Sequence, residues 1–253
     1  MKNLPPNLKP PYAIGECFWG VRDVEAFYQA QYDLVAALPD PAAGVFVNDN
    51  TVAIQRSLAF TRDKPFMAAY SKHASTEAER GVIWRTATLV WAARQAMRVE
   101  GAFVECGCYK GTSARILVDA VELTRPFHIY DLFEHDKAMA HHSMPEHGPD
   151  LFQQVKARFA DASNVVVTQG RVPESLSNAP ARIAFLHVDM NNVEAEIGAL
   201  ETLFDRMAPG GVVILDDFGW LAYRRQQEAE IAWFAARGYP VLELATGQGM
   251  VIK

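Results

Sequence analysis

Three aspartates at the ends of two apolar runs are the residues of this chain best suited to chemistry. Asp189 ends the run Phe185–Asp189, and the adjacent Asp216 and Asp217 end the run Gly210–Asp217. Ligands bind at the carboxyl ends of the strands in a parallel sheet, so two such strands would direct three carboxylates into one crevice. Like charges so close together are unfavourable unless a proton or a cation relieves them. Because carboxylate oxygens suit hard divalent ions, the pattern predicts a Mg²⁺ site formed by these three residues.

A glycine-containing turn marks a second candidate site, where an apolar strand pattern passes into a helical one. Gly107 and Gly111 would let the backbone approach a ligand closely there, although their spacing is neither that of a dinucleotide fingerprint nor that of a P-loop. Glu105 and Asp131 end the first and second predicted strands in carboxylates, and an acid at the second position commonly binds the ribose hydroxyls of an adenosine cofactor. A tight packing turn without a ligand, and a turn cap at Asp131, are the alternative interpretations.

The elements that would position these residues alternate between strand and helix from residue 101 onward. The periodicity predicts strands at 102–106, 127–131, 165–168, 183–189 and 212–216, helices at 112–121, 151–160, 193–207 and 222–237, and a closing hairpin over 241–252. Such alternation is typical of an α/β fold. We therefore expect a Rossmann-like, doubly wound, mostly parallel sheet of seven strands with an antiparallel last strand.

The first part of the chain carries a different pattern, which predicts an N-terminal arm and helical cap over residues 1–74. The α/β domain would then occupy residues 75–253. Helices are expected at 22–37 and 75–98, with a connecting segment at 38–62. Because an arm and helices outside a core sheet often serve dimer contacts, we expect a homo-oligomer.

Composition and charge narrow the class of protein. The chain has 253 residues and a net charge of −6, which argues against a nucleic-acid or anionic-membrane surface. Its three cysteines, Cys17, Cys106 and Cys108, show neither a disulfide framework nor a metal-binding spacing. The proline-rich start lacks the apolar core of a signal peptide, and no apolar run approaches the about 20 residues of a membrane span. We expect a cytoplasmic protein.

Together these motifs resemble those of class I S-adenosylmethionine-dependent methyltransferases, and in particular those of the macrocin O-methyltransferase family. The resemblance is carried by the segments Val104–Gly111, Tyr130–Glu134, Gly170–Leu176, Leu186–Asp189 and Met207–Phe218. The last segment is the most specific, because Pro-Gly-Gly before a strand that ends in Asp-Asp is hard to produce by packing alone. The resemblance implies a methyltransferase domain over residues 75–253 and leaves the N-terminal part of the chain without a counterpart.

The resemblance implies chemistry as well as fold. Members of the macrocin family methylate sugar hydroxyls on natural products and bind Mg²⁺ through three aspartates, which correspond here to Asp189, Asp216 and Asp217. The resemblance also implies S-adenosylmethionine as cofactor, with contacts from Glu105, Gly107, Lys110, Gly111, Asp131 and Asp189. We therefore expect a Mg²⁺-dependent O-methyltransferase of natural product biosynthesis, acting on a hydroxyl of a sugar-bearing or polyhydroxylated small molecule.

One departure from the family pattern concerns the proton acceptor of the reaction. The family usually has Asp-Gly-Asp at the first metal strand, whereas this chain has Asp189-Met190-Asn191, and an amide cannot take a proton near neutral pH. Asn191 or Asn192 is expected to ligate the metal or to hold the substrate hydroxyl by hydrogen bonding. Either another residue is the base, or the metal acidifies the hydroxyl enough without one.

Histidines supply the candidate bases, because an imidazole near its ordinary pKa suits general-base catalysis. Four of them lie in the polar stretch 132–150, which is long for a strand–helix connection and is therefore a candidate lid. They are His135, His141, His142 and His147. The adjacent His141 and His142 are the preferred catalytic candidates, and solvent exposure without a role is the alternative. His187 shares a side of its strand with Asp189 and is expected to be a core histidine.

Two other interpretations of the methyltransferase pattern stay open. A catechol-type O-methyltransferase has a similar layout but usually ends the last metal strand in Asp-Asn, which Asp217 disfavours. A catalytically inactive binding protein that kept the fold is suggested by Asn191. A nicotinamide-dependent dehydrogenase is disfavoured by the glycine spacing and by the lack of a convincing Tyr-x-x-x-Lys pair.

Overall fold

The computed structural model describes most of the chain, which folds as two compact units. The residues described are 15, 17–38, 44–135 and 144–253. The units are Met1–Ala87 and Thr88–Lys253, and the division between them falls inside helix α4 (Ile83–Ala96). This division lies later in the chain than the boundary predicted between residues 74 and 75, because the start of α4 still belongs to the first unit.

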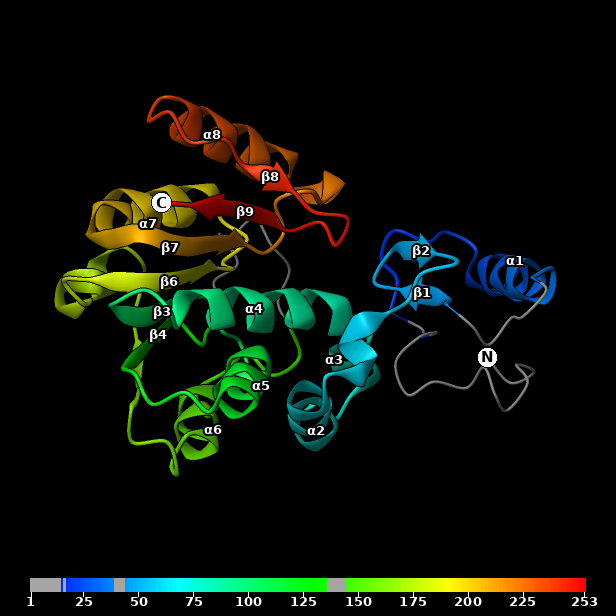
Figure 1. The fold of residues 1–253 in the computed structure, drawn as a ribbon, viewed down its shortest axis with the longest axis horizontal. Helices are drawn as coiled ribbons and strands as arrows, with labels where there is room; N and C mark the ends of the chain where they lie inside the picture. The colour runs from blue at the N-terminus through cyan, green and yellow to red at the C-terminus, as the bar shows by residue number, and fades with distance from the viewer. Residues whose placement is uncertain (1–14, 16, 39–43, 136–143) are drawn as a thin grey trace. The chain divides into compact units, whose positions relative to one another are not determined.

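The larger unit is built around a seven-stranded sheet of order β5-β4-β3-β6-β7-β9-β8 (Figure 1). Its strands are β3 (Ala102–Cys106), β4 (Phe127–Asp131), β5 (Val165–Gln169), β6 (Ile183–Val188), β7 (Met207–Leu215), β8 (Leu242–Glu243) and β9 (Gly249–Ile252). Neighbouring strands are parallel from β5 to β7, and β9 runs antiparallel to both β7 and β8. The expected Rossmann-like sheet with an antiparallel finish is confirmed. Its strand order reverses between β3 and β6, where open α/β sheets bind ligands.

Helices cover the faces of this sheet. They are α4, α5 (Thr112–Val121), α6 (Leu151–Arg158), α7 (Val193–Leu203) and α8 (Arg224–Ala235), with the short 3₁₀ turns η3 (Glu174–Asn178), η4 (Phe204–Arg206) and η5 (Leu221–Tyr223). Leu186 of β6 belongs to one buried apolar cluster with Leu200 of α7 and Phe234 of α8. Because successive side chains of a strand point to opposite faces, Glu105 and His187 face the side of the sheet away from α7 and α8.

Two predicted elements differ from the structure at their ends. The helix expected at 75–98 is two helices, α3 (Glu77–Gly81) and α4, because Val82 leaves the helical conformation between them (φ −85°, ψ 22°). Strand β7 begins at Met207 rather than at residue 212, because the chain already pairs with β6 there. The preceding helix α7 accordingly ends at Leu203 and not at the predicted residue 207.

The smaller unit contains a hairpin that the sequence pattern did not indicate. Its elements are α1 (Val24–Ala36), β1 (Phe46–Asn48), β2 (Thr51–Ala53), η2 (Ala59–Arg62), α2 (Lys64–His73) and α3. Strands β1 and β2 pair antiparallel, and the two residues between them, Asp49 and Asn50, both have a φ of 51°. Two residues of positive φ form the tight turn that joins hairpin strands. The segment predicted as a connection at 38–62 therefore contains a hairpin.

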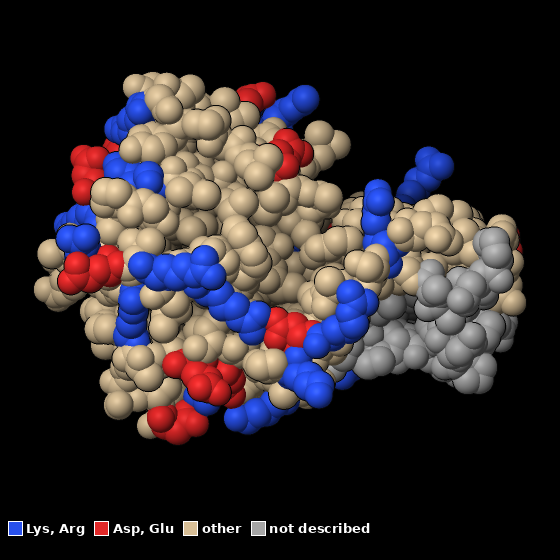
Figure 2. Space-filling view, viewed as in Figure 1, with Lys and Arg blue, Asp and Glu red and all other residues tan. Residues whose placement is uncertain are grey.

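The surface carries both signs of charge. On the face drawn in Figure 2, basic and acidic side chains lie close to one another over the larger unit. This mixture accords with the modest net charge of −6. None of the helices formed by the described residues has the length and apolar character needed to cross a membrane.

Gly107 determines how closely the turn after β3 approaches the end of β6. Its φ is 87°, and a Cβ at this position would lie 1.8 Å from the carbonyl oxygen of Asp189. The N–H of Asp189 in turn donates to the carbonyl oxygen of Cys106 at 2.8 Å. Only glycine fits this backbone and this space, so the turn and the aspartate are held against each other at the ligand-binding edge of the sheet.

The substitution Gly107→Ala is expected to lower the free energy of unfolding by about 3 kcal/mol or more, because the clash is with backbone and no side-chain rotation relieves it. Gly238→Ala is the matched control. Gly238 also has a positive φ, 79°, but a Cβ added there would meet nothing within 4 Å, so only the about 1–2 kcal/mol of left-handed backbone is lost. Urea denaturation measures the free energy of unfolding of both variants. Equal losses in the two variants would contradict the clash expected between a Cβ at position 107 and the carbonyl of Asp189.

Candidate functional site

A cavity of about 540 Å³ lies at the carboxyl ends of β3, β4, β5 and β6. Small-molecule sites typically occupy about 300–1,000 Å³. Three cofactor contacts expected from the sequence, Gly107, Asp131 and Asp189, line this cavity together. Residues 170–174, which follow β5, and most of residues 190–195, which follow β6, form further walls. The sheet thus gathers ligand-binding candidates from four strand ends around one volume.

Asp131 fastens the glycine turn to the end of β4. Its Oδ2 accepts the backbone N–H groups of Cys108 (2.7 Å) and Tyr109 (2.8 Å), and its Oδ1 accepts that of Phe133 (2.6 Å). Burial raises the pKa of this carboxyl, while the hydrogen bonds from Phe133 and Cys108 lower it. The turn cap that the sequence offered as an alternative is therefore present. Since Asp131 also lines the cavity, its contact with a ribose stays a prediction.

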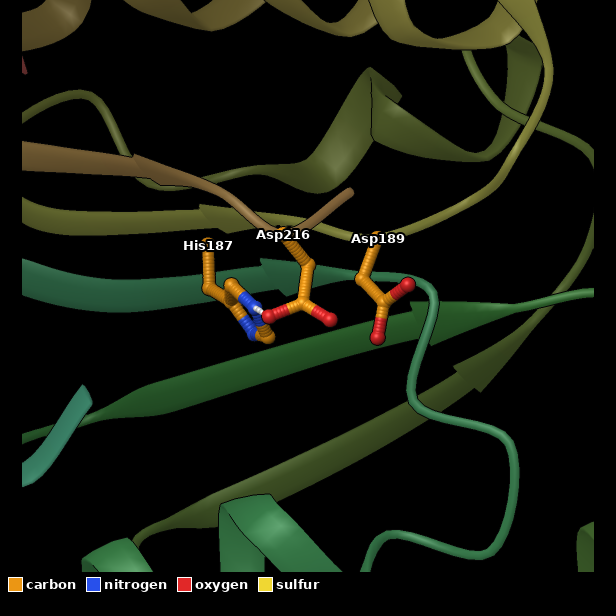
Figure 3. Close-up of side chains that lie close together, drawn as sticks. All are labelled: His187, Asp189 and Asp216. Atoms are coloured by element: carbon orange, nitrogen blue, oxygen red, sulfur yellow. Dashed lines mark ion pairs between the residues drawn. The ribbon is translucent and has the colours of Figure 1, made fainter. Parts of the chain in front are cut away.

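A buried row of polar side chains connects β3, β6 and the end of β7. Glu105 and His187 are partners in the parallel register of β3 and β6, and Glu105 Oε1 lies 2.8 Å from His187 Nδ1. On the other side of the ring, Nε2 lies 3.5 Å from Oδ1 of Asp216, which also accepts a hydrogen bond of 2.8 Å from Gln248. Figure 3 shows the imidazole and the Asp216 carboxylate meeting, with Asp189 beyond them.

The charges in this row oppose the effect of burial. Burial by itself would lower the pKa of His187, but the adjacent carboxylates of Asp216 and Glu105 raise it well above its ordinary value. Burial raises the pKa of Glu105, against the opposing effect of His187. When no other cation is bound, the protonated ring is the positive charge that the two carboxylates share.

His187, Asp189 and Asp216 together form a group that can hold a metal ion. Each offers one ligand atom, and these atoms lie within 4.8 Å of one another (Figure 3). An imidazole and two carboxylates suit a divalent ion, and His187 Nε2 is a buried nitrogen without a hydrogen-bond partner among the described residues. The residues present therefore fit a metal, and two of the three predicted ligands are brought together.

Asp217, the third predicted ligand, does not belong to this group of ligand atoms. Its charge instead raises the pKa of Glu230 in α8, on the face of the sheet opposite to His187. Successive side chains at the end of a strand point to opposite sides, which explains why adjacent aspartates separate. Metal ligation by Asp217 stays a prediction.

Asn191 lines the cavity with its backbone in the left-handed conformation, at a φ of 55°. Oε1 of the buried Glu196 accepts the backbone N–H groups of Asn191 (2.9 Å) and Met190 (3.0 Å) and so fixes this turn. The side-chain Oδ1 of Asn191 is buried and has no hydrogen-bond partner in the described part of the chain. This oxygen is therefore available to accept a hydrogen bond from a hydroxyl or N–H group.

The candidate histidine bases occupy different places. His147 lines the cavity, but its Nδ1 accepts the N–H of Met144 at 3.1 Å, so the neutral ring carries its hydrogen on Nε2 and has no free lone pair there. His135 stacks on His147 with ring centroids 6.0 Å apart and is not a lining residue. His141 and His142 lie outside the described residues, and their catalytic role stays a prediction.

Three expected cofactor contacts are not among the residues that line the cavity. Glu105 is 2 % exposed and binds His187. The Nζ of Lys110 pairs with Oε1 of Glu146 at 3.2 Å. Gly111, the N-cap residue directly before α5, adopts a φ of 68°. Direct contact of these three residues with a cofactor stays a prediction.

Sequence reasoning underestimated His187 and missed Glu196 and Gln248. The two-residue spacing of His187 and Asp189 placed both side chains on one side of the strand, which was the available signal. The register that sets Glu105 opposite His187 could not be read from either strand alone. Glu196 resembles an ordinary acid of a first helical turn, so nothing marked it as the group that fixes the turn of Asn191.

The part of the chain that forms this site is similar to a known protein family. Residues 104–218 match the family model described as a methyltransferase domain, a span that runs from β3 through the aspartates after β7. This part of the chain is similar to a methyltransferase domain. The prediction of a methyltransferase enzyme is thereby confirmed, whereas the match does not distinguish the macrocin family from other methyltransferases.

Solved structures share the fold at low sequence identity. The O-methyltransferase NovP is 16 % identical, with a TM-score of 0.58 over 73 % of this chain and 88 % of that chain. CalS11, a TDP-rhamnose 3′-O-methyltransferase of calicheamicin biosynthesis, is 15 % identical, with a TM-score of 0.53 over 93 % and 96 % of the two chains. The Podospora anserina methyltransferase PaMTH1, bound to SAH, is 12 % identical, with a TM-score of 0.51 over 93 % and 97 %. No curated protein sequence matches the chain significantly.

A pair of buried carboxyl groups lies behind the Asn191 turn. Glu196 of α7 and Glu230 of α8 are both buried, and the interaction between their carboxyl groups favours a proton on one of them. Burial and the charge of Glu230 raise the pKa of Glu196 well above its ordinary value. Burial raises the pKa of Glu230 from 4.5 to about 7. Because the folded protein holds this proton more tightly than the unfolded chain, its stabilising contribution is full below pH 4.5 and is lost as the pH rises through about 7.

Glu230→Gln removes this titration and keeps the size of the side chain. We expect the free energy of unfolding of the variant to rise relative to the unaltered protein between about pH 5 and about pH 8, by on the order of 1–3 kcal/mol. Urea denaturation at several pH values measures this difference. Glu228→Gln, at an exposed position of the same helix, is the control and should show no such trend. A pH-independent difference for Glu230→Gln would show that the pair holds no shared proton.

Proposed function

We propose that the protein is an S-adenosylmethionine-dependent, divalent-metal-dependent O-methyltransferase acting on a hydroxyl of a sugar-bearing or polyhydroxylated small molecule. The observation that carries this proposal is the meeting of two features at Asp189. Asp189 lines the cavity with Gly107 and Asp131, and it also belongs to the metal-binding group with Asp216. A cofactor in the cavity would therefore lie next to a bound ion.

The cavity wall suits the cofactor. Gly107 brings backbone to the cavity without a side chain, and the Asp131 carboxylate lies at the end of the second strand, where acids commonly bind ribose hydroxyls. The match to a methyltransferase domain and the SAH-bound state of PaMTH1 support S-adenosylmethionine as the methyl donor. The sulfonium would lie toward the turn after β6, where the acceptor must also approach.

Asp189 and Asp216 would hold the metal, and carboxylates alone favour Mg²⁺. A bound divalent ion lowers the pKa of a coordinated hydroxyl and fixes its orientation. In the transfer itself, the hydroxyl oxygen bonds to the methyl carbon as the carbon–sulfur bond breaks, S-adenosylhomocysteine leaves, and the hydroxyl proton passes to solvent or to a base. Asn191, which cannot take that proton, would hold the acceptor hydroxyl through its buried Oδ1.

Similar proteins support the acceptor class. CalS11 is described as a TDP-rhamnose 3′-O-methyltransferase and NovP as an O-methyltransferase, and both share the fold of this chain. A sugar presents neighbouring hydroxyls, which an ion can hold together while one of them is aligned behind the sulfonium methyl. Such positioning supplies a large part of the rate of a transfer reaction.

The direct test is methyl transfer from S-adenosylmethionine to a panel of glycosides and nucleotide sugars, together with titration calorimetry of cofactor binding. We expect cofactor binding that survives a chelator, and methyl transfer that falls by about a hundredfold or more when the metal is removed, because the ion acts on the hydroxyl. Asp189→Asn should lower turnover similarly, whereas Asp205→Asn, at an exposed position, should not. Absence of S-adenosylmethionine binding would refute the proposed function, and turnover unaffected by a chelator would refute its metal dependence.

Asn191 offers a second test, because its role is distinct from that of a base. Asn191→Gly keeps the left-handed backbone and removes the amide, so kcat should fall by about tenfold, the effect of losing about 1.4 kcal/mol of positioning. Asn191→Asp keeps an oxygen acceptor and should retain turnover. Both variants should bind S-adenosylmethionine normally in calorimetry. Unchanged kcat in Asn191→Gly would show that the amide does not hold the acceptor.

A further inference from the structure

The two nitrogens of the His187 ring have different surroundings. The ring is 2 % exposed, and its Nδ1 lies 2.8 Å from Oε1 of Glu105. Its Nε2 has no hydrogen-bond partner among the residues that the structure describes. This second nitrogen instead faces Oδ1 of Asp216 at 3.5 Å, and Figure 3 shows it directed toward that carboxylate.

The hydrogen bond between His187 Nδ1 and Glu105 determines whether Nε2 carries a hydrogen or a lone pair. A carboxylate can only accept, so the ring hydrogen of neutral His187 lies on Nδ1 and the lone pair lies on Nε2. A lone pair facing a carboxylate oxygen is repulsive unless a positive charge lies between them. A histidine that donates one ring N–H to a carboxylate and directs the other nitrogen toward further ligands has the arrangement usual for metal-binding histidines.

We propose that Nε2 of His187 is a ligand of the divalent ion, beside Asp189 and Asp216, and that this nitrogen makes the site prefer Mn²⁺ or Co²⁺ to Mg²⁺. The proposal rests on the metal dependence proposed above and extends it to the identity of the ligands and the ion. Glu105 acts as a positioning residue, since it holds the ring in the orientation that directs Nε2 toward Asp216.

The choice of ion follows from the ligand atoms. Carboxylate oxygens accept Mg²⁺ and Mn²⁺ alike, whereas an imidazole nitrogen favours transition ions and binds Mg²⁺ poorly. The predicted alternative of three aspartates would contain oxygen ligands only and would favour Mg²⁺. Asp217 lies outside the group of three ligand atoms, and the imidazole takes its place.

The alternative to a metal ion between His187 Nε2 and Asp216 is a proton on Nε2. The metal-bound and the protonated states can be distinguished by spectroscopy. Pulsed EPR of the full chain loaded with Mn²⁺ detects a directly bonded nitrogen through its hyperfine coupling to the electron spin. We expect a ¹⁴N coupling of directly coordinated imidazole in the unaltered protein, and its loss in His187→Gln. His128→Gln, which removes a half-buried histidine from strand β4, on the far side of β3 from β6, is the matched control and should keep the coupling.

Calorimetric titrations give a second readout that needs no turnover. We expect Co²⁺ to bind the unaltered protein at least about a hundredfold more tightly than Mg²⁺, and His187→Gln to reduce this preference by about tenfold or more. Glu105→Gln should weaken Co²⁺ binding by about tenfold, because it keeps an acceptor for Nδ1 but removes the charge that makes the ring a better ligand.

The outcomes separate this proposal from the proposed function. Mn²⁺ bound without nitrogen coupling, or no bound Mn²⁺ at all, overturns the role of His187, and the spectrum of the unaltered protein decides this even if His187→Gln fails to fold. Metal-dependent methyl transfer with oxygen ligands alone would overturn the His187 proposal and leave the proposed function standing. Nitrogen-coupled Mn²⁺ in a protein that does not bind S-adenosylmethionine would support the ligand and refute the proposed function.

Discussion

The need of buried carboxylates for a positive charge governs the ligand-binding edge of this protein. Glu105 and Asp216 come from strands on either side of β6, and His187 between them supplies a donor toward one and a nitrogen toward the other. Taking two carboxylates out of water is unfavourable unless a proton or a metal ion compensates them. The row of Glu105, His187 and Asp216 therefore connects three strands and forms a cation site beside the cavity.

The backbone around the site is as constrained as its charges. Gly107 admits the carbonyl of Asp189 at a distance that no side chain allows, and Glu196 fixes the left-handed turn of Asn191 from behind. The ion and the cofactor would thus be held by groups that are themselves fixed, which is the condition for accurate positioning of two reactants. The structure consequently supports metal binding better than it supports removal of the hydroxyl proton. The residue at position 191 is an asparagine, whose amide cannot act as the base.

The sheet could be predicted because strand and helix periodicities alternate clearly after residue 101, and the strand ends indicated the aspartates and the glycine turn. Three features could not be predicted, for physical reasons. The hairpin at Asp49 depends on two local positive-φ residues inside a segment without periodicity. The pairing of Glu105 with His187 depends on the register of strands far apart in the chain. The separation of Asp217 from Asp216 follows from alternation at the strand end, which adjacency in sequence conceals.

A crystal structure of the protein with S-adenosylhomocysteine and Mn²⁺ is the most direct test of the central claim, that one site joins cofactor and metal at Asp189. The account predicts S-adenosylhomocysteine in the cavity, in contact with Gly107 and Asp131. It also predicts an anomalous manganese peak within bonding distance of Asp189, Asp216 and His187 Nε2. Cofactor bound elsewhere, or a manganese peak away from Asp189, would contradict it.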